Sequence, residues 1–415
     1  MKVDEQEVQQ AAELLRKREI VEAFKLIDLN LDEETVVTQN MLMELVRWDW
    51  NLFLLAEDED LINEIRSQAE MRDPWMGYVY ARYHDAVMPE TNSLQIATDY
   101  YDAAIEYGIA DAMVYEAMSW RDGEYGVRNM QKYHELCEKA LDKGSVRAVM
   151  QISFDRIYGN SGYEAQPQHV FDTLVRYVDT CDADGTHYDP YYMHLIGRAC
   201  EAMGKRQLAA KWYERAMEAG DAKSCYPLAF MRAYDEYGSN IIDFDAFSEI
   251  MERGRAIYAP KAYLEVTLAM TQDMFDTASE EDQQTYYKLI KDELELSARM
   301  GDHVADYTLA SYYLDGLFGF DQDYNEAFRW AARGALLRDD GCYGILADMV
   351  RDGIAPGNRG EEFQHYCELQ ALRYSWHEYE VRRYMKRVVE AYQHGYLTDY
   401  AAEIEQYYLP QIEEE

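Results

Sequence analysis

Residues 301–335, GDHVADYTLASYYLDGLFGFDQDYNEAFRWAARGA, contain the arrangement that decides the fold of this chain. Gly301 is followed by Ala305 after four residues, Leu309 after eight and Ala310 after nine. The same order of small and apolar residues recurs, with some divergence, after Gly108, Gly144 and Gly220. A second glycine follows fifteen residues after Gly108, Gly144 and Gly301, at Gly123, Gly159 and Gly316. Self-similarity at intervals of roughly 35–45 residues is typical of solenoids built from helical hairpins.

The residue types in this repeat suit a pair of packed helices. A glycine at a helix C-terminus can adopt the left-handed conformation that ends the helix. Small residues let two helices approach closely, and large side chains fill the seam between hairpins. We therefore expect five large side chains to be buried in the seams: Trp212, Tyr213, Leu309, Tyr313 and Trp330.

The pattern resembles the Sel-one-like repeat (SLR), a relative of the tetratricopeptide repeat. The resemblance is clearest in the copy from residue 301 to 335, at Gly301, Ala305, Leu309, Ala310, Tyr313, Gly316, Asp323, Ala327, Trp330, Gly334 and Ala335. The sequence GEYGV at residues 123–127 is similar to the Gly-x-Gly-Val turn of the family with one extra residue. The resemblance covers roughly residues 90–375 and implies an all-α fold, a right-handed α-solenoid of stacked antiparallel helix pairs.

The ends of the chain are expected to be helical but divergent, because a terminal unit of a solenoid must present one face to water. We assign residues 1–72 to an N-terminal capping region, residues 73–373 to the repeats, and residues 374–415 to a C-terminal cap. Near the last boundary lies a basic cluster, which consists of Arg373, Arg382, Arg383, Lys386 and Arg387. We interpret it as a solvated helix face that offsets nearby glutamates; a docking site for an acidic segment is the alternative.

The composition is strongly acidic, with 79 Asp and Glu residues against 40 Lys and Arg residues and a formal net charge of −39. Binding to nucleic acid or to an anionic membrane surface is therefore disfavoured, because it requires neutralisation of phosphates by Lys and Arg. The acidity is explained by solubility, or alternatively by a surface that attracts a basic partner.

The sequence also favours a cytoplasmic protein. The first residues, MKVDEQ, are too polar for a signal peptide, and the apolar run Leu52–Ala56 is too short to span a bilayer. The 6 cysteines are scattered without a Cys-x-x-Cys motif, which is typical of buried thiols in a reducing compartment.

No motif predicts an enzyme, a cofactor or a metal site. The chain contains no phosphate-binding loop, dinucleotide fingerprint or nucleophile elbow. The pairs His134/Cys137 and His365/Cys367 have metal-like spacing, but each lacks a second pair nearby. The segment from Asp182 to Asp189 is only faintly similar to a calcium loop, because it lacks the glycine and glutamate that such a loop needs.

The candidate binding surface follows from the resemblance. In the related tetratricopeptide hairpin the first helix lines a concave groove, which implies that residues three, six, ten and thirteen after each repeat glycine face that groove. The resulting candidate partner-binding residues are Met118, Arg121, Arg147, Met150, Phe154, Lys223, Tyr226, Phe230 and Tyr307. Apolar side chains on an exposed concave face indicate a binding surface; alternatively, the superhelix is tight enough for them to pack on one another.

Together these features favour a non-enzymatic interaction scaffold that binds a peptide or protein segment in its concave groove. The alternative is an acidic inhibitor or immunity-type protein that neutralises a basic partner such as a nuclease. An accessory subunit of an enzyme is a third hypothesis. Binding in the groove should resist salt, whereas binding through the acidic surface should weaken steeply as salt is added.

Overall fold

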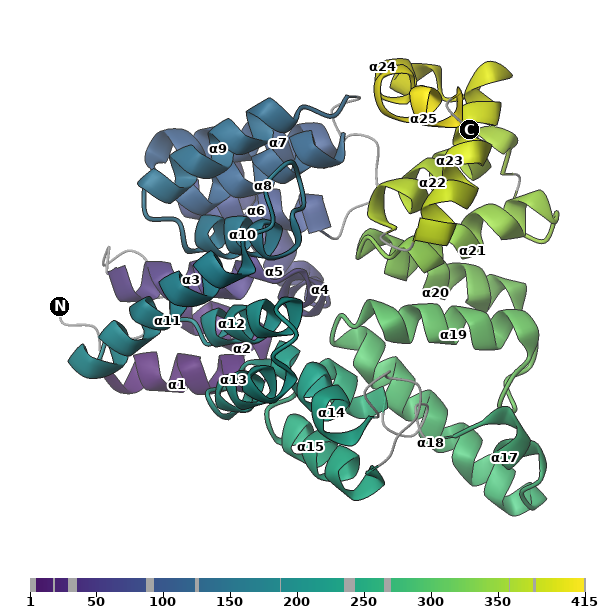
Figure 1. Cartoon of the computed structure of the whole chain (residues 1–415), viewed down its shortest axis with the longest axis horizontal. Coiled ribbons are helices and arrows are strands. Elements are labelled where there is room, and N and C mark those ends of the chain that lie inside the picture. The colour runs from purple at the N-terminus through teal and green to yellow at the C-terminus, as the bar shows by residue number, and fades with distance from the viewer. Residues whose placement is uncertain are drawn as a thin grey trace. The chain divides into compact units, whose positions relative to one another are not determined.

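The computed structural model describes residues 5–17, 19–28, 36–86, 93–123, 127–186, 188–234, 243–264, 270–357, 359–375 and 378–413. All regular elements in these ranges are helical, and they contain no β-strand (Figure 1). The predicted all-α fold is therefore confirmed for the described part of the chain. Residues 124–126 of the predicted GEYGV turn lie outside the described residues.

The chain divides into two compact units. Unit 1 comprises Met1–Arg82, Ala97–Ala117 and Met130–Glu265, and unit 2 comprises Tyr83–Ile96, Met118–Asn129 and Val266–Glu415. The first helices are α1 (Glu5–Arg16), α2 (Ile20–Asp28), α3 (Val36–Arg47), α4 (Asp49–Leu55), α5 (Glu59–Glu70), α6 (Pro74–Ala86), α7 (Ser93–Tyr107) and α8 (Ala110–Asp122). The division assigns part of α6, α7 and α8 to each unit.

Unit 1 continues with α9 (Met130–Asp142), α10 (Val146–Tyr158), α11 (Pro167–Asp184), α12 (Tyr191–Ala202), α13 (Arg206–Glu218), α14 (Cys225–Ala233) and α15 (Phe244–Ala256). The main helices of unit 2 are α17 (Gln272–Asp276), α18 (Glu280–Arg299), α19 (His303–Asp315), α20 (Tyr324–Leu336), α21 (Asp340–Arg351), α22 (Glu361–Tyr374) and α23 (Glu378–Gln393), followed by the short turns α24 (Ala401–Glu403) and α25 (Leu409–Glu413).

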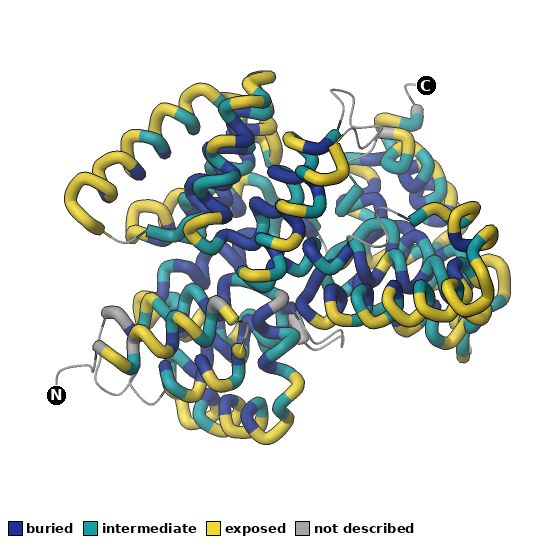
Figure 2. The backbone as a smooth tube through the Cα atoms, turned by 90° about the horizontal axis from the view of Figure 1, so that it is seen from below, coloured by how far each residue is buried: buried dark blue, intermediate teal, exposed yellow. Residues whose placement is uncertain are grey.

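Helices that follow one another in sequence pack as hairpins, and successive hairpins stack. The helix pairs that make extensive contacts with each other include α12 with α13, α14 with α15, α19 with α20, and α21 with α22. The first helices of neighbouring hairpins also touch, as α10 does with α12 and α19 with α21. Figure 2 shows buried and exposed residues alternating along the helices, as expected where each helix packs on its neighbours along one side. The right-handed sense of the superhelix stays a prediction.

A two-residue junction links one hairpin to the next. Gly144 and Gly301 follow the ends of α9 and α18 in the left-handed conformation, with φ of 82° and 86°. The next residue, Ser145 or Asp302, donates its backbone N–H to the carbonyl five residues earlier, at 3.0 and 3.1 Å. The side chain of that same residue accepts a backbone N–H at the start of the following helix, which begins at once. One junction thus ends a helix and starts the next.

The left-handed turn of this junction also occurs where no glycine is present, although at Tyr258 the next residue is Ala259, which has no side chain that could cap a helix. Arg72, Tyr258 and Arg338 adopt left-handed φ values of 70°, 54° and 61°. The residue after Arg338, Asp339, donates its N–H to Gly334 O at 3.2 Å and caps α21. The repeat therefore continues through positions at which another residue takes the place of the glycine.

The seams explain why small residues recur. A Cβ atom on Gly334 of α20 would lie 2.4 Å from the sulfur of Cys342 on α21, and a Cβ atom on Gly254 of α15 would lie 2.3 Å from the sulfur of Cys225 on α14. Neither contact is possible for any residue larger than glycine without movement of the helices. All six cysteines are free and buried, as the sequence predicted.

The large seam residues are placed as predicted, with one exception. Tyr213 and Leu309 are fully buried, and Tyr313 and Trp330 retain only 9% and 6% exposure. Trp212 is only half-buried, and the Arg215 guanidinium lies 5.1 Å from its ring centre. Trp212 therefore covers the edge of its seam instead of filling it.

We expect Trp330→Ala to lower the free energy of unfolding by about 3–5 kcal/mol, because it removes a large buried ring and leaves a cavity. Urea unfolding monitored by circular dichroism measures this loss. Trp212→Ala is the matched control, and its loss should be less than half as large. Equal losses for the two variants would contradict the assigned seam.

The junction itself can be tested without disturbing a contact. A Cβ atom on Gly220 (φ 99°) meets no atom within 4 Å, so Gly220→Ala changes only the backbone preference and should cost about 1 kcal/mol. Arg72 is exposed at φ 70°, and Arg72→Gly should stabilise the protein by about 0.5–1 kcal/mol. The sign of the two changes in thermal unfolding checks the assignment; the same sign for both would refute it.

Candidate partner-binding site

The candidate groove residues differ widely in exposure. Met118 and Met150 are buried, with 9% and 1% exposure, so the expectation that they are partly accessible is wrong. Met150 packs in the interior because the first helices α10 and α12 stack closely on each other. The two methionines are therefore not open to a partner, and the alternative that the candidate residues pack on one another stays a prediction.

The remaining candidates keep some contact with solvent. Arg147, Phe154, Lys223, Tyr226 and Phe230 are half-buried in unit 1. In unit 2, Arg121 is half-buried and forms an ion pair with its neighbour Asp122 at 2.6 Å. Tyr307 of α19 is 42% exposed, and its ring lies beside Gly341 at the start of α21.

In unit 1 the N-terminal region itself covers part of the candidate row. The corner between α3 and α4 is formed by Arg47, Trp48 and Asp49. It lies against side chains at the third position after a repeat glycine. Trp48 packs edge-on against the ring of Tyr191 at 5.1 Å, and the Lys223 ammonium lies 4.2 Å from the Trp48 ring centre. The region predicted to be a terminal cap thus fills a surface that the sequence indicated as free.

Arg47 holds this corner in place through charge. Its guanidinium is 5% exposed and forms ion pairs with Asp189 at 2.6 Å and with Asp111, at the start of α8, at 3.6 Å. Tyr115 of α8 donates its hydroxyl to the Arg47 carbonyl at 2.9 Å. Because a buried charge must be paired, these contacts fix α3 onto the first helices of the repeats.

A second arginine completes the contact. Arg82 of α6 is 1% exposed, donates Nε–H to Val46 O at 3.0 Å, and forms an ion pair with Asp49. Its guanidinium lies 3.7 Å from the ring centre of Tyr115. The corner is therefore held on two sides by buried arginines.

Two of the basic residues among the candidates, Lys223 and Arg147, already contact aromatic rings within unit 1. Lys223 faces Trp48 and Tyr191, and burial, together with the charge of Arg147, lowers the pKa of its ammonium to about 8. The Arg147 guanidinium lies 5.5 Å from the ring centre of Tyr115. These two residues stabilise the covered part of the row.

The rings of two aromatic candidates, Phe154 and Phe230, contact other aromatic rings of unit 1. The ring of Phe154 lies 5.1 Å from that of Tyr158, which is 37% exposed and carries the Arg198 guanidinium at 5.3 Å. The ring of Phe230 stacks on Tyr234 at 5.0 Å. These side chains are half-open to solvent and adjacent to cations.

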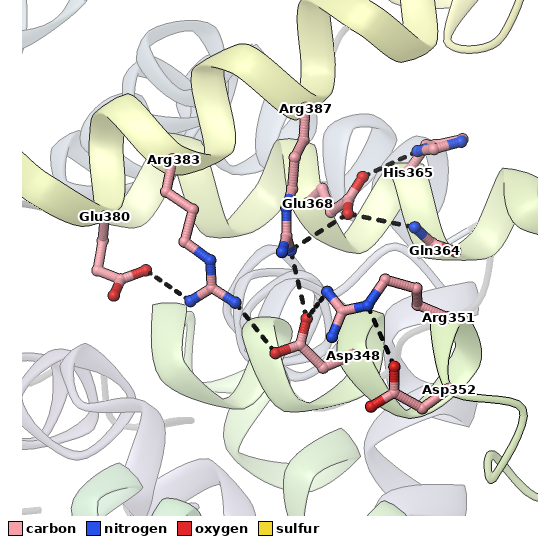
Figure 3. A network of polar contacts seen from close by, with 9 residues as sticks. All are labelled: Asp348, Arg351, Asp352, Gln364, His365, Glu368, Glu380, Arg383 and Arg387. Carbon is pink, nitrogen blue, oxygen red and sulfur yellow. Dashed lines mark hydrogen bonds and ion pairs between the residues drawn. The ribbon is translucent and has the colours of Figure 1, made fainter.

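Two arginines of the basic cluster in the C-terminal region, Arg383 and Arg387, are paired with carboxylates of their own unit (Figure 3). Arg383 and Arg387 of α23 both pair with Asp348 of α21, at 3.1 and 3.3 Å. Arg387 also lies 3.5 Å from Glu368 of α22, and the buried Arg373 pairs with the buried Glu403. Arg383 and Arg387 thus join α23 to carboxylates of α21 and α22, as expected for a helix face offset by nearby acids. The expectation of a solvated face is wrong for Arg373, whose side chain is buried.

The residues with metal-like spacing make ordinary contacts. The Nε2 atom of His134 is 2.6 Å from Ser161 O, and Nδ1 of His365 is 2.8 Å from Glu368. In the part of the chain that the structure describes, no group of three or more His, Cys, Asp or Glu side chains is arranged to hold a metal ion. Asp189 pairs with Arg47. No described helix has the length and apolar character that a membrane span requires.

Sequence reasoning missed the contribution of Arg47, Arg82 and Asp189. Their signals were present but not specific: three charged residues at separate places in an acidic chain. The capping Asp and Ser residues that directly follow the left-handed residue, such as Ser145 and Asp302, could have been found from the sequence as a recurrent pair.

No protein-family model matches the chain, and no curated protein matches it. Similar solved structures include a Sel1 repeat protein from Oxalobacter formigenes, which is 14% identical with a TM-score of 0.39 over 82% of this chain and 94% of that one. Another is a protective antigen of uropathogenic Escherichia coli strains that displays an SLR fold, 13% identical with a TM-score of 0.36 over 96% of this chain and 97% of that one. Both are described by the repeat type that the present sequence resembles.

We expect Arg47→Gln to lower the free energy of unfolding by about 3–5 kcal/mol, because it leaves Asp111 and Asp189 without their shared buried counter-ion. Arg383→Gln is the matched control, since this partly exposed arginine should contribute about 1 kcal/mol or less. Urea unfolding of both variants measures the difference. If the two losses are equal, Arg47 does not hold α3 in place.

Proposed function

We propose that this protein is a non-enzymatic interaction scaffold that binds a peptide or protein segment along the first helices of unit 1. The binding residues in this proposal are Phe154, Tyr226 and Phe230, all of unit 1. The single observation that carries it is the presence of half-buried aromatic side chains on α10 and α14, the first helices of two hairpins, in a highly charged protein. Apolar surface of this kind is stabilised when a partner covers it.

The neighbourhood of these rings favours a segment that is partly acidic. Arg198 lies beside Tyr158, which contacts Phe154, and the Lys261 ammonium lies 4.9 Å from the ring centre of Tyr226. Arg206 lies 5.9 Å from the ring centre of Phe230, but it also donates hydrogen bonds to the carbonyls of Phe230 and Tyr234. We assign Arg198 and Lys261 the role of orienting carboxylates, and Arg206 that of holding the end of α14.

The second candidate function is neutralisation of a basic partner by the acidic surface. The net charge of −39 favours it, and so does the pairing of Arg383 and Arg387 with carboxylates of their own unit. The two functions differ in their response to salt, because exposed charges are screened and apolar contacts are not.

The test is capture of partners from cells of the source organism by the tagged full chain and by Phe154→Ala/Phe230→Ala. We expect the double variant to lose its partner while its circular dichroism stays that of the wild type. The matched control, Phe244→Ala/Tyr379→Ala, removes two exposed rings (51% and 75%) outside the row and should retain the partner.

Binding that survives 0.5 M salt in the wild type and is lost in the double variant supports the groove, at a salt level where the screening length is only about 3–5 Å. Binding that disappears in salt and is unaffected by the two phenylalanines would overturn the groove and favour the acidic surface.

A further inference from the structure

Unit 1 contains a cleft that the proposed function does not use. Its volume is about 580 Å³, within the usual range for a ligand site. It is lined by residues of helix α3 and by the junctions between α7 and α8 (Tyr107–Asp111) and between α9 and α10 (Lys143–Val146). Phe154, Tyr226 and Phe230 do not line it.

The charges of the cleft do not balance. Three carboxylates line it, those of Glu44, Asp111 and Asp189, against the two cations Arg47 and Lys143. Both aspartates pair with the buried Arg47, and Lys143 is exposed to solvent. The Glu44 carboxylate forms no hydrogen bond with any described residue. The cleft therefore has a carboxylate that is available to a positively charged ligand.

A second observation concerns a buried acceptor that lines the same cleft. Asp111 is only 2% exposed, yet its Oδ2 atom accepts no hydrogen bond from the described residues and has only the ion pair with Arg47. The Nε atom of Arg47 likewise donates none among these residues. Buried polar atoms in this condition are stabilised when a ligand or a water molecule completes their hydrogen bonds.

Aromatic rings line the rest of the cleft. Trp75 packs edge-on against Tyr107 at 6.3 Å, and Tyr177 packs edge-on against Tyr192 at 5.4 Å. Tyr107 and Tyr177 remain 53% and 45% exposed. The face of an aromatic ring attracts an ammonium or guanidinium group, and its apolar surface accommodates the alkyl stem of a long side chain.

We propose that this cleft binds the cationic side chain of a lysine or arginine in a basic peptide segment. The positive group lies beside the Glu44 carboxylate, and the alkyl stem packs against Tyr107 and Tyr177. The site is separate from the aromatic row of the proposed function, so either can fail without the other.

The pH dependence of binding follows from Glu44. Burial and the charge of Asp189 raise the pKa of its carboxyl to about 7, against the lowering effect of Arg47. The other charged groups that line the cleft are Asp111 and Lys143. A cation binds better to the ionised carboxylate, so the affinity should rise as the pH increases from 6 to 8.

The probe is the peptide acetyl-Gly-Lys-Gly-Arg-Gly-amide, titrated into the full chain and measured by isothermal titration calorimetry at low salt. Its neutral counterpart replaces lysine by norleucine and arginine by citrulline. We expect the cationic peptide to bind and the neutral one not to. Equal binding of the two peptides, or binding of neither, would overturn the proposal.

Variants locate the site. Glu44→Gln should weaken binding about tenfold, the effect of about 1.4 kcal/mol, and should abolish the rise between pH 6 and 8. Lys143→Gln should strengthen binding, because it removes a competing positive charge. Glu252→Gln, which removes an exposed charge from α15 away from the cleft, is the matched control. If Glu44→Gln and Glu252→Gln have the same effect, the peptide binds to the general acidic surface and the proposal is wrong.

The same titration separates this proposal from the previous one. Phe154→Ala/Phe230→Ala should bind the probe peptide as the wild type does. Loss of probe binding in that variant would place the peptide on the aromatic row and overturn the assignment to the cleft.

Discussion

The two-residue junction between hairpins is the constraint on which the rest of the structure depends. The ends of two helices leave backbone carbonyls and N–H groups that must find partners. A left-handed residue turns the chain so that the next N–H reaches back to a carbonyl of the finished helix, and the Ser or Asp that follows caps the new helix. Because only one further residue, Lys143 or Met300, separates the finished helix from this pair, neighbouring helices must lie close together. Their closeness in turn requires small residues in the seams, as Gly334 against Cys342 demonstrates.

Much of this fold could be predicted from the sequence, because the junction and the seam restrict residue type. Gly144, Gly301 and Gly316 have no equally good substitute in the left-handed conformation, so they recur and reveal the period. The prediction failed where the restriction is weaker. Arg72, Tyr258 and Arg338 adopt the same conformation without being glycine, because the surrounding hydrogen bonds outweigh a backbone penalty of roughly 1–2 kcal/mol. The spacing of glycines therefore does not reveal the repeat boundaries at these three residues.

The candidate site was less predictable, because it depends on contacts between segments far apart in the chain. The position of a residue on its helix indicates the direction of its side chain but not what lies opposite. Met150 occupies a position that the resemblance assigns to an open groove, and it is buried. Lys223 occupies such a position too, and it faces Trp48, which precedes it by 175 residues (223 − 48). Nothing in the local pattern around either residue identifies its distant neighbour.

The use of arginine connects the fold to the kind of ligand that the protein favours. Basic residues are outnumbered, 40 to 79, and several of the arginines point inward. In unit 1, Arg47 and Arg82 hold the corner between α3 and α4 against the repeats; in unit 2, Arg383 and Arg387 hold α23 against Asp348 of α21. Each such pair uses one positive and one negative charge, so the remaining charges keep the full net excess of −39 while fewer cations are left among them. A cation that approaches the protein therefore meets an attractive potential. Glu44 lines a cleft in which aromatic rings and a free carboxylate add specific contacts to that general attraction.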